Sequence, residues 1–147
     1  MDILHHPQNN SNSRLQNFIE DAIIRAAGTP MIWGTDDCCL FVADIIAEGT
    51  GIDPAEPWRG KYTSEDEAAV VMPGGIVKTV DRRCRELGWS KVPPEKADIG
   101  DIGISRNDGK PAVVIRYGEW WVGRCDGGVT YTPPDLVFLA WSVPWRR

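Results

Sequence analysis

A cysteine at the expected start of a helix is the feature of this sequence best suited to chemistry. Residues 33–39 read Trp-Gly-Thr-Asp-Asp-Cys-Cys and lead directly into an apolar pattern with helical spacing. Thr35, Asp36 or Asp37 can cap this helix by accepting hydrogen bonds from its first free backbone N–H groups. Cys38 then falls in the first turn, where the helix dipole and the free N–H groups favour a thiolate. Because the thiolate is the reactive form, Cys38 is the candidate nucleophile.

A structural role for the same residue is the alternative. Free cysteines are among the most buried residues and commonly act as small hydrophobic side chains. Asp36 and Asp37 also oppose the thiolate, because nearby negative charge raises the pKa of a thiol. Cys39 points about 100° away from Cys38 around the helix axis. If one of the two thiols faces a cleft, we expect the other to face the core.

Length, charge and cysteine spacing restrict the class of protein. The 147 residues suffice for one domain, and the net charge of −5 argues against general nucleic-acid binding. No two of the four cysteines have C-x-x-C spacing, so we expect reduced thiols, no metal site and no cofactor. The N-terminus lacks the pattern of a signal peptide, and no apolar run has the length of a membrane span.

The first half of the chain has helical periodicity. We expect a mobile, polar N-terminal arm over residues 1–12 and a single domain over residues 13–147. Ser13 and Gln16 form a capping box that predicts the start of the first helix. Apolar spacing and Gly or Pro breakers predict helices over about residues 13–27, 38–49, 64–72 and 76–87, with Cys84 in the core.

The second half changes to the period of strands. Short segments rich in Val, Ile, Tyr and Trp alternate with turns of Asn, Asp and Gly. They predict strands at 101–105, 112–117, 120–124, 129–131 and 136–145. Helices followed by a meandering antiparallel sheet predict the α+β class. Trp120 and Trp121 are adjacent on one of these strands, so one of them must face outward.

A loop rich in Gly and Pro separates the second and third helices. Residues 49–62 contain the large side chains of Trp58, Arg59 and Tyr62. These side chains either pin the loop to the core or line a recognition surface.

Three of these segments resemble the NlpC-type, papain-like cell-wall cysteine peptidases. Trp33-Gly34 and Asp37-Cys38 with Phe41-Val42 are similar to the segment around that family's nucleophile. Segment 97–102, Ala-Asp-Ile-Gly-Asp-Ile, and segment 112–118, Ala-Val-Val-Ile-Arg-Tyr-Gly, resemble two of its strands. The resemblance implies a papain-like fold in which the helix carrying Cys38 packs on a small antiparallel sheet.

A narrower resemblance covers more of the chain, from about Phe18 to the last strand. The motif around Cys38, the segment Thr50–Ala55 and the segment Trp58–Tyr62 are similar to small phage and prophage proteins encoded among tail genes. This resemblance implies synthesis in a host cytoplasm and a place in a virion tail or tail tip, with other tail proteins as partners.

The sequence departs from the active peptidases at the catalytic histidine. That position falls on Ala112, or on Pro111 if the register shifts by one residue, and neither side chain accepts a proton. The chain's two histidines, His5 and His6, lie in the predicted arm, which would position a base badly. Peptide hydrolysis needs a general base and a general acid, and at neutral pH a carboxylate or phenol is a poor substitute for imidazole. Such groups near Cys38 would come from Asp44, Tyr62 or Asp101.

Three functions remain open from the sequence. The first, which we favour, is a catalytically silent tail or tail-tip component. The second is a peptidase or amidase that cleaves peptidoglycan during infection, with Cys38 as nucleophile and neighbouring N–H groups as oxyanion hole. The third is a module that binds a peptidoglycan stem peptide or a tail-protein peptide without cutting it. The residues expected to contact such a ligand are Trp33, Asp37, Trp58 and Tyr62.

Overall fold

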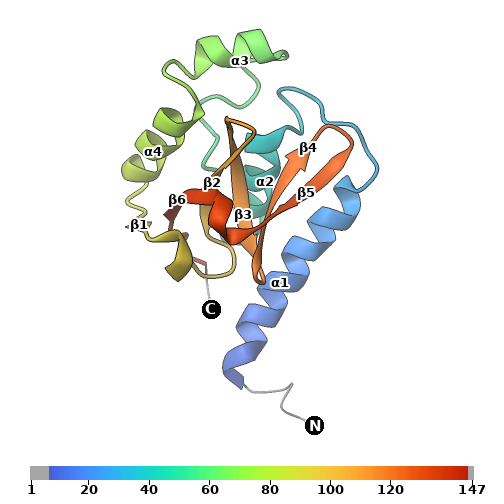
Figure 1. The fold of residues 1–147 in the computed structure, drawn as a ribbon, viewed down its shortest axis with the longest axis vertical. Helices are drawn as coiled ribbons and strands as arrows, with labels where there is room; N and C mark the ends of the chain where they lie inside the picture. The colour runs from blue at the N-terminus through green and yellow to red at the C-terminus, as the bar shows by residue number, and fades with distance from the viewer. Residues whose placement is uncertain (1–6, 146–147) are drawn as a thin grey trace.

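The computed structural model describes residues 7–145. It contains four α-helices followed by a six-stranded antiparallel sheet, which confirms the α+β class. Figure 1 shows the strands in front of α2, with α1 along one side and α3 and α4 toward the other. The helices are α1 (Pro7–Ala26), α2 (Cys38–Thr50), α3 (Glu65–Val71) and α4 (Ile76–Glu86).

Helix α1 begins earlier than the sequence pattern predicts. Its first residue is Pro7, so the predicted start at Ser13 is wrong and residues 7–12 belong to the helix. Proline is tolerated in the first turn of a helix, and no proline or glycine interrupts the segment before its end. The remainder of the predicted arm, with His5 and His6, lies outside the described residues.

The sheet has the strand order β1-β6-β2-β3-β4-β5. The strands are β1 (Lys91–Val92), β2 (Ile102–Asn107), β3 (Lys110–Tyr117), β4 (Trp120–Cys125), β5 (Gly128–Thr132) and β6 (Val137–Trp141). Asp108 and Gly109, with φ of 54° and 76°, form the tight turn between β2 and β3, which is one of the turns of Asn, Asp and Gly expected between the predicted strands. The sequence pattern missed β1, and it extended β6 too far, since Pro144 and the chain around it run beyond the sheet.

The two faces of the sheet are covered differently. Helix α2 packs against β3 and β4, and its residues Leu40 and Ile46 are fully buried in the main core. A smaller cluster on the other face centres on Trp121, which is 0% exposed, whereas Trp120 is 48% exposed. The expectation that one of these tryptophans faces outward is therefore confirmed. Cys38, at the start of α2, packs against the main core.

Candidate functional site

Asp37 is the residue that caps α2. Its Oδ1 accepts a hydrogen bond from the backbone N–H of Leu40 at 3.0 Å. Its Oδ2 accepts from the backbone N–H of Gly34 at 2.9 Å and from the hydroxyl of Tyr62 at 2.6 Å. The carboxylate is only 1% exposed, so these three donors replace water around a buried charge. The turn before the helix and the loop after it are thereby fixed to one carboxylate.

Cys38 is the first residue of α2 and is partly exposed. The thiol of Cys39 and the backbone N–H groups of Val113 and Cys39 donate hydrogen bonds to its sulfur and lower its pKa. Burial and the neighbouring Asp37 carboxylate act in the opposite direction, but the pKa of Cys38 remains lowered. The electrostatics therefore favour a thiolate at this position.

Cys39 has the opposite character. Donation of its thiol to Cys38 and burial raise its pKa well above the ordinary value for cysteine. It lies in the core, as the 100° rotation from Cys38 predicts. Cys84 is also buried, as expected, and burial raises its pKa to about 12. Of these three thiols, only Cys38 combines some exposure with a lowered pKa.

The start of β3 lies against Cys38, as the hydrogen bond from Val113 shows. Val113 belongs to the core cluster on the α2 side, and Val114 belongs to the cluster on the other face. Since side chains alternate along a strand, Ala112 points away from α2 and Pro111 lies on the face toward it. Of the two positions considered for a missing histidine, the geometry therefore favours Pro111.

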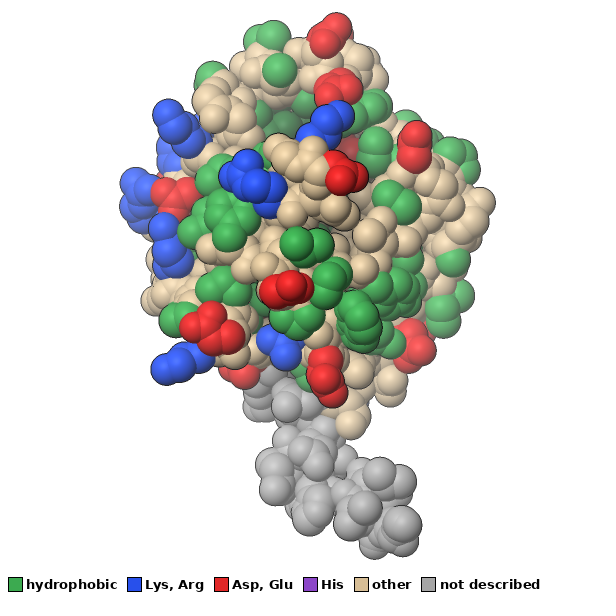
Figure 2. Space-filling model, viewed as in Figure 1, with side chains coloured by type: hydrophobic (Ala, Val, Ile, Leu, Met, Phe, Trp, Pro, Cys, Tyr) green, Lys and Arg blue, Asp and Glu red, His purple; other side chains and the backbone are tan. Residues whose placement is uncertain are grey.

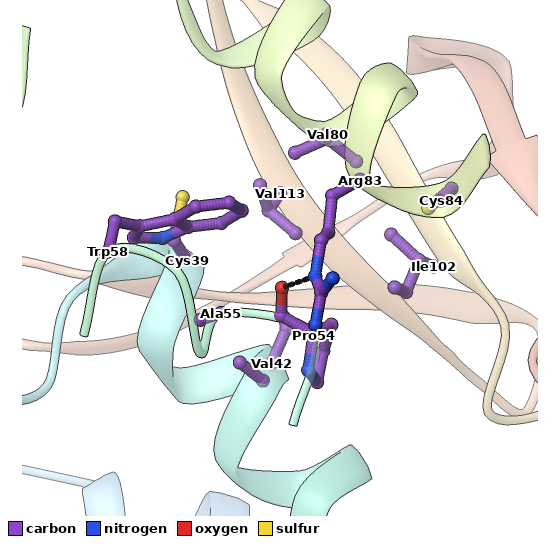
Figure 3. Close-up of a pocket in the computed structure, with 11 residues that line it drawn as sticks. Cys39, Val42, Pro54, Ala55, Trp58, Val80, Arg83, Cys84, Ile102 and Val113 are labelled. Atoms are coloured by element: carbon purple, nitrogen blue, oxygen red, sulfur yellow. Dashed lines mark hydrogen bonds between the residues drawn. The ribbon is translucent and has the colours of Figure 1, made fainter. Parts of the chain in front are cut away.

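Trp58 and Tyr62 attach the loop between α2 and α3 to the core. Tyr62 is buried, and its hydroxyl donates to Asp37. Trp58 is also buried and lines a cavity of about 30 Å³ together with Cys39 and Val113 (Figure 3). Its Nε1 has no hydrogen-bond partner within residues 7–145. Both side chains pin the loop, which is one of the two roles the sequence left open.

The guanidinium of Arg83 closes one side of the same cavity. It donates to the backbone oxygens of Pro54 and Asp53 at 2.8 and 3.2 Å, so α4 also holds this loop (Figure 3). Trp33, the remaining residue proposed for ligand binding, is partly buried and packs against the main core.

The other candidates for a base near Cys38 are engaged elsewhere. Asp44 forms an ion pair with Arg59 at 2.8 Å, and Tyr62 donates to Asp37. The Asp101 carboxylate accepts from the backbone N–H groups of Asp98 and Val143 at 2.8 and 3.0 Å. Within residues 7–145 the sequence contains no histidine, and the structure shows no cluster of side chains suited to a metal ion.

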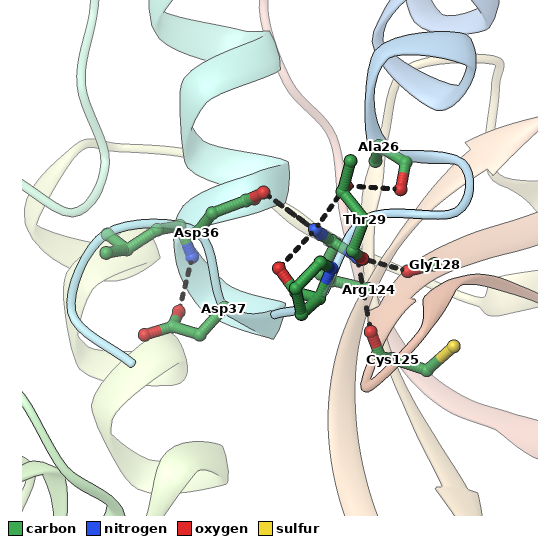
Figure 4. Close-up of polar contacts among 9 residues, drawn as sticks. Ala26, Thr29, Asp36, Asp37, Arg124, Cys125 and Gly128 are labelled. Carbon is green, nitrogen blue, oxygen red and sulfur yellow. Dashed lines mark hydrogen bonds and ion pairs between the residues drawn. The ribbon is translucent and has the colours of Figure 1, made fainter. Parts of the chain in front are cut away.

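Arg124 on β4 is the residue near the site that sequence reasoning missed. Its side chain is 0% exposed and forms an ion pair with Asp36 at 2.9 Å (Figure 4). It also donates to the backbone oxygens of Thr29, Pro30 and Gly128, so it ties the α1–α2 connection to the β4–β5 hairpin. An arginine between the apolar residues of a strand was the signal for this role, because such a charge must be paired when buried.

These features define an α+β protein whose central helix begins with a capped, partly exposed cysteine against an antiparallel sheet. Residues 10–143 match the family described as a domain of unknown function, DUF6950, and the chain belongs to that family. No curated protein sequence matches the chain. Among the described residues, no helix is both long enough and apolar enough to cross a membrane.

Proposed function

We propose that this protein is a structural or assembly component of a bacteriophage tail or tail tip. In this proposal its domain is a papain-like, NlpC-type fold that has lost peptide hydrolysis. The tail assignment depends on the resemblance of the motif around Cys38, and of segments 50–55 and 58–62, to proteins encoded among phage tail genes.

The observation that carries the loss of hydrolysis is the pairing of Cys38 with the start of β3. The partners of its sulfur are the backbone N–H groups of Val113 and Cys39 and the Cys39 thiol, none of which accepts a proton from a nucleophile at neutral pH. The β3 side chain on this face before Val113 is Pro111. Amide hydrolysis also requires an acid that protonates the leaving amine, and Pro111 supplies none.

Hydrolysis of purified peptidoglycan is the direct test of a silent site. We expect the full-length chain and its Cys38→Ala variant to release no stem peptide or free amine, measured by mass spectrometry of the soluble fraction. Release by the unmodified chain that Cys38→Ala abolishes would overturn the silent site. Binding of intact stem peptide without release would instead support the non-cleaving module.

Restoring a histidine tests the papain-like arrangement itself. We expect Pro111→His to lower the apparent pKa of Cys38 alkylation by iodoacetamide, because an imidazolium on the α2 face would stabilise the thiolate. Ala112→His is the matched control, since its side chain should point to the opposite face, and Pro111→Gln controls for loss of the proline. An equal effect of the two histidines would contradict the proposed correspondence between β3 and the histidine strand.

A peptidoglycan-cleaving cysteine peptidase or amidase is the second candidate. The observation that favours it is the lowered pKa of Cys38, because three hydrogen-bond donors stabilise its thiolate. This candidate needs a base and an acid from outside residues 7–145, and the hydrolysis assay distinguishes it from the first.

Mass spectrometry of purified phage particles tests the tail assignment. We expect peptides of this chain in intact particles or in isolated tails, and their enrichment in tails relative to heads. If the chain is detected in the lysate and not in the purified particles, the assignment to the virion is overturned.

A further inference from the structure

Three aromatic side chains lie together at the end of the sheet that is next to α1. Tyr117 and Trp120 are paired across the two-residue turn between β3 and β4, so their side chains lie on the same face. Tyr131 on β5 lies on this face too, because it pairs with Val122, two residues after Trp120. The ring centroids of Tyr117 and Tyr131 are 6.4 Å apart. We call these three side chains, Tyr117, Trp120 and Tyr131, the aromatic surface.

The aromatic surface is open to solvent. Trp120 is 48% exposed and Tyr131 is 47% exposed, which leaves much of both rings uncovered. Figure 2 shows hydrophobic side chains gathered on the lower half of the molecule, where Figure 1 places the β3–β4 turn beside α1, and Asp and Glu side chains border them. Neighbouring exposed aromatic side chains of this kind are typical of a surface that binds a partner.

A carboxylate of α1 lies beside the aromatic surface. The β3–β4 turn contacts α1, since Gly118 lies against the side chain of Gln16. Glu20 follows one helical turn later on the same side of α1. Burial and then the negative charge of Glu20 raise the pKa of Tyr117, so the carboxylate is close to that ring. Glu20 is exposed and forms no ion pair within residues 7–145, and the residues three and four positions from it on the helix are uncharged.

The aromatic surface also lacks a cation from the chain itself. Elsewhere the guanidinium of Arg106 lies 4.7 Å from the ring centroid of the exposed Phe138. No Lys or Arg of residues 7–145 takes this place at the aromatic surface. Arg116, which is on the neighbouring part of β3, donates instead to the backbone oxygens of Gly118 and Ala97 at 2.7 and 3.1 Å. Exposed aromatic faces and an unpaired carboxylate therefore lie side by side.

We propose that the aromatic surface and Glu20 bind an arginine side chain of a partner protein. Aromatic faces attract cations, and the carboxylate accepts hydrogen bonds from a charged donor, so both features select a cation. A planar guanidinium can stack on a ring and donate two parallel hydrogen bonds to a carboxylate, whereas the ammonium of lysine cannot. The net charge of −5 also favours the approach of a basic partner. The proposal holds whether or not the tail assignment is correct.

NMR titration with small peptides is the test. The probe is an end-blocked tripeptide with arginine between two glycines, and the matched peptide carries citrulline, whose side chain has nearly the same shape but no charge. With the ¹⁵N-labelled full chain, we expect the arginine peptide to shift the indole N–H signal of Trp120 and the amide signals of Glu20 and Tyr131. We expect smaller shifts with the citrulline peptide and with a lysine peptide, and weaker binding of the arginine peptide at high salt.

Substitutions at exposed positions complete the test without disturbing the core. Glu20→Gln should weaken binding of the arginine peptide by about threefold, because it removes the charge and keeps the size of the side chain. Glu56→Gln, at an exposed position of the loop after α2, is the matched control. Trp120→Leu should also weaken binding, whereas Phe138→Leu, which removes an exposed ring on another strand, should not.

Three outcomes would contradict the proposal. Equal shifts with the arginine and citrulline peptides would show that the charge is not recognised. Shifts that map elsewhere, or no shifts at all, would show that the aromatic surface does not bind arginine. The same shifts on concentrating the chain alone would identify a second copy of this chain as the occupant and would also overturn the proposal.

Discussion

The start of α2 and the β1–β6 edge are held together in opposite ways. At the start of α2, buried charges are surrounded by hydrogen-bond donors and acceptors, as Asp37 and Arg124 show. At the edge, charged side chains such as Lys91 are in contact with solvent. The ammonium of Lys91 lies 3.6 Å from an oxygen of Asp81, and both side chains are partly exposed. Removal of a buried partner leaves a desolvated polar group, whereas removal of an exposed charge returns water to its place. The difference predicts where substitutions reduce stability and where they leave it almost unchanged.

The largest loss of stability is expected from Arg124→Met. This substitution leaves the carbonyls of Thr29, Pro30 and Gly128 without their buried donor and Asp36 without its cation. We expect the free energy of unfolding, measured by urea denaturation, to fall by about 4 kcal/mol. Arg106→Met, at an exposed position, is the matched control and should change it by less than about 0.5 kcal/mol. Similar values for the two variants would contradict the comparison.

Asp37→Ala should have the next largest effect. It removes the cap of α2 and leaves the hydroxyl of Tyr62 and the N–H of Gly34 buried without their acceptor. The expected loss in the free energy of unfolding is about 3 kcal/mol. Asp98→Ala changes an exposed aspartate in the same way and serves as control.

Asp37→Asn separates the cap from the buried charge. The amide can keep the hydrogen bond from Leu40 but cannot accept from both Gly34 and Tyr62 with its second group, so we expect an intermediate loss. If Asp37→Asn loses as little unfolding free energy as Asp98→Ala, the negative charge of Asp37 contributes little to stability.

Tyr62→Phe should cost less, because Asp37 keeps its two backbone donors. We expect a loss of about 1.5 kcal/mol at neutral pH. Burial and the Asp37 carboxylate raise the pKa of Tyr62 in the folded protein above its ordinary value. The contribution of the Tyr62 hydroxyl to stability is therefore complete below the ordinary tyrosine pKa of about 10. It decreases as the pH rises above this value, because Tyr62 then ionises in the unfolded chain but not in the folded protein.

Urea denaturation at pH 8 and above pH 10 measures this dependence. The difference in stability between the unmodified chain and Tyr62→Phe should narrow at the higher pH. Tyr131→Phe is the control, because Tyr131 is 47% exposed. A difference that stays constant with pH would contradict the role assigned to the hydroxyl.

Most of the elements could be predicted from the sequence because their patterns are local. Apolar periodicity located α2 and α4, and the Asp-Gly turn located the β2–β3 hairpin. The predicted start of α1 at Ser13 was wrong, because a capping pattern can also occur inside a helix that begins earlier, here at Pro7. Strand β1 was missed because two residues carry no periodic signal, and only pairing with Trp141 and Ala140 makes them a strand.

The site was predictable in part for the same reason. The position of Cys38 in a first turn and the different environment of Cys39 follow from helix geometry. The sequence left three candidates for the cap of α2, and only the contacts in the structure, such as that between Asp37 and Tyr62, distinguish them. The side of the sheet on which Pro111 lies likewise depends on the register of β3. Arg124 and Asp36 are 88 residues apart, so no local pattern relates them.

The smallest effect on stability is expected at the β1–β6 edge, and it completes the comparison. Lys91→Met removes an ammonium that lies 6.0 Å from the ring centroid of Trp141 and 3.6 Å from an Asp81 oxygen. Because both interactions are in contact with solvent, we expect the free energy of unfolding to change by less than about 0.5 kcal/mol. A loss above about 1 kcal/mol would mean that this edge, like the start of α2, depends on its charges for stability.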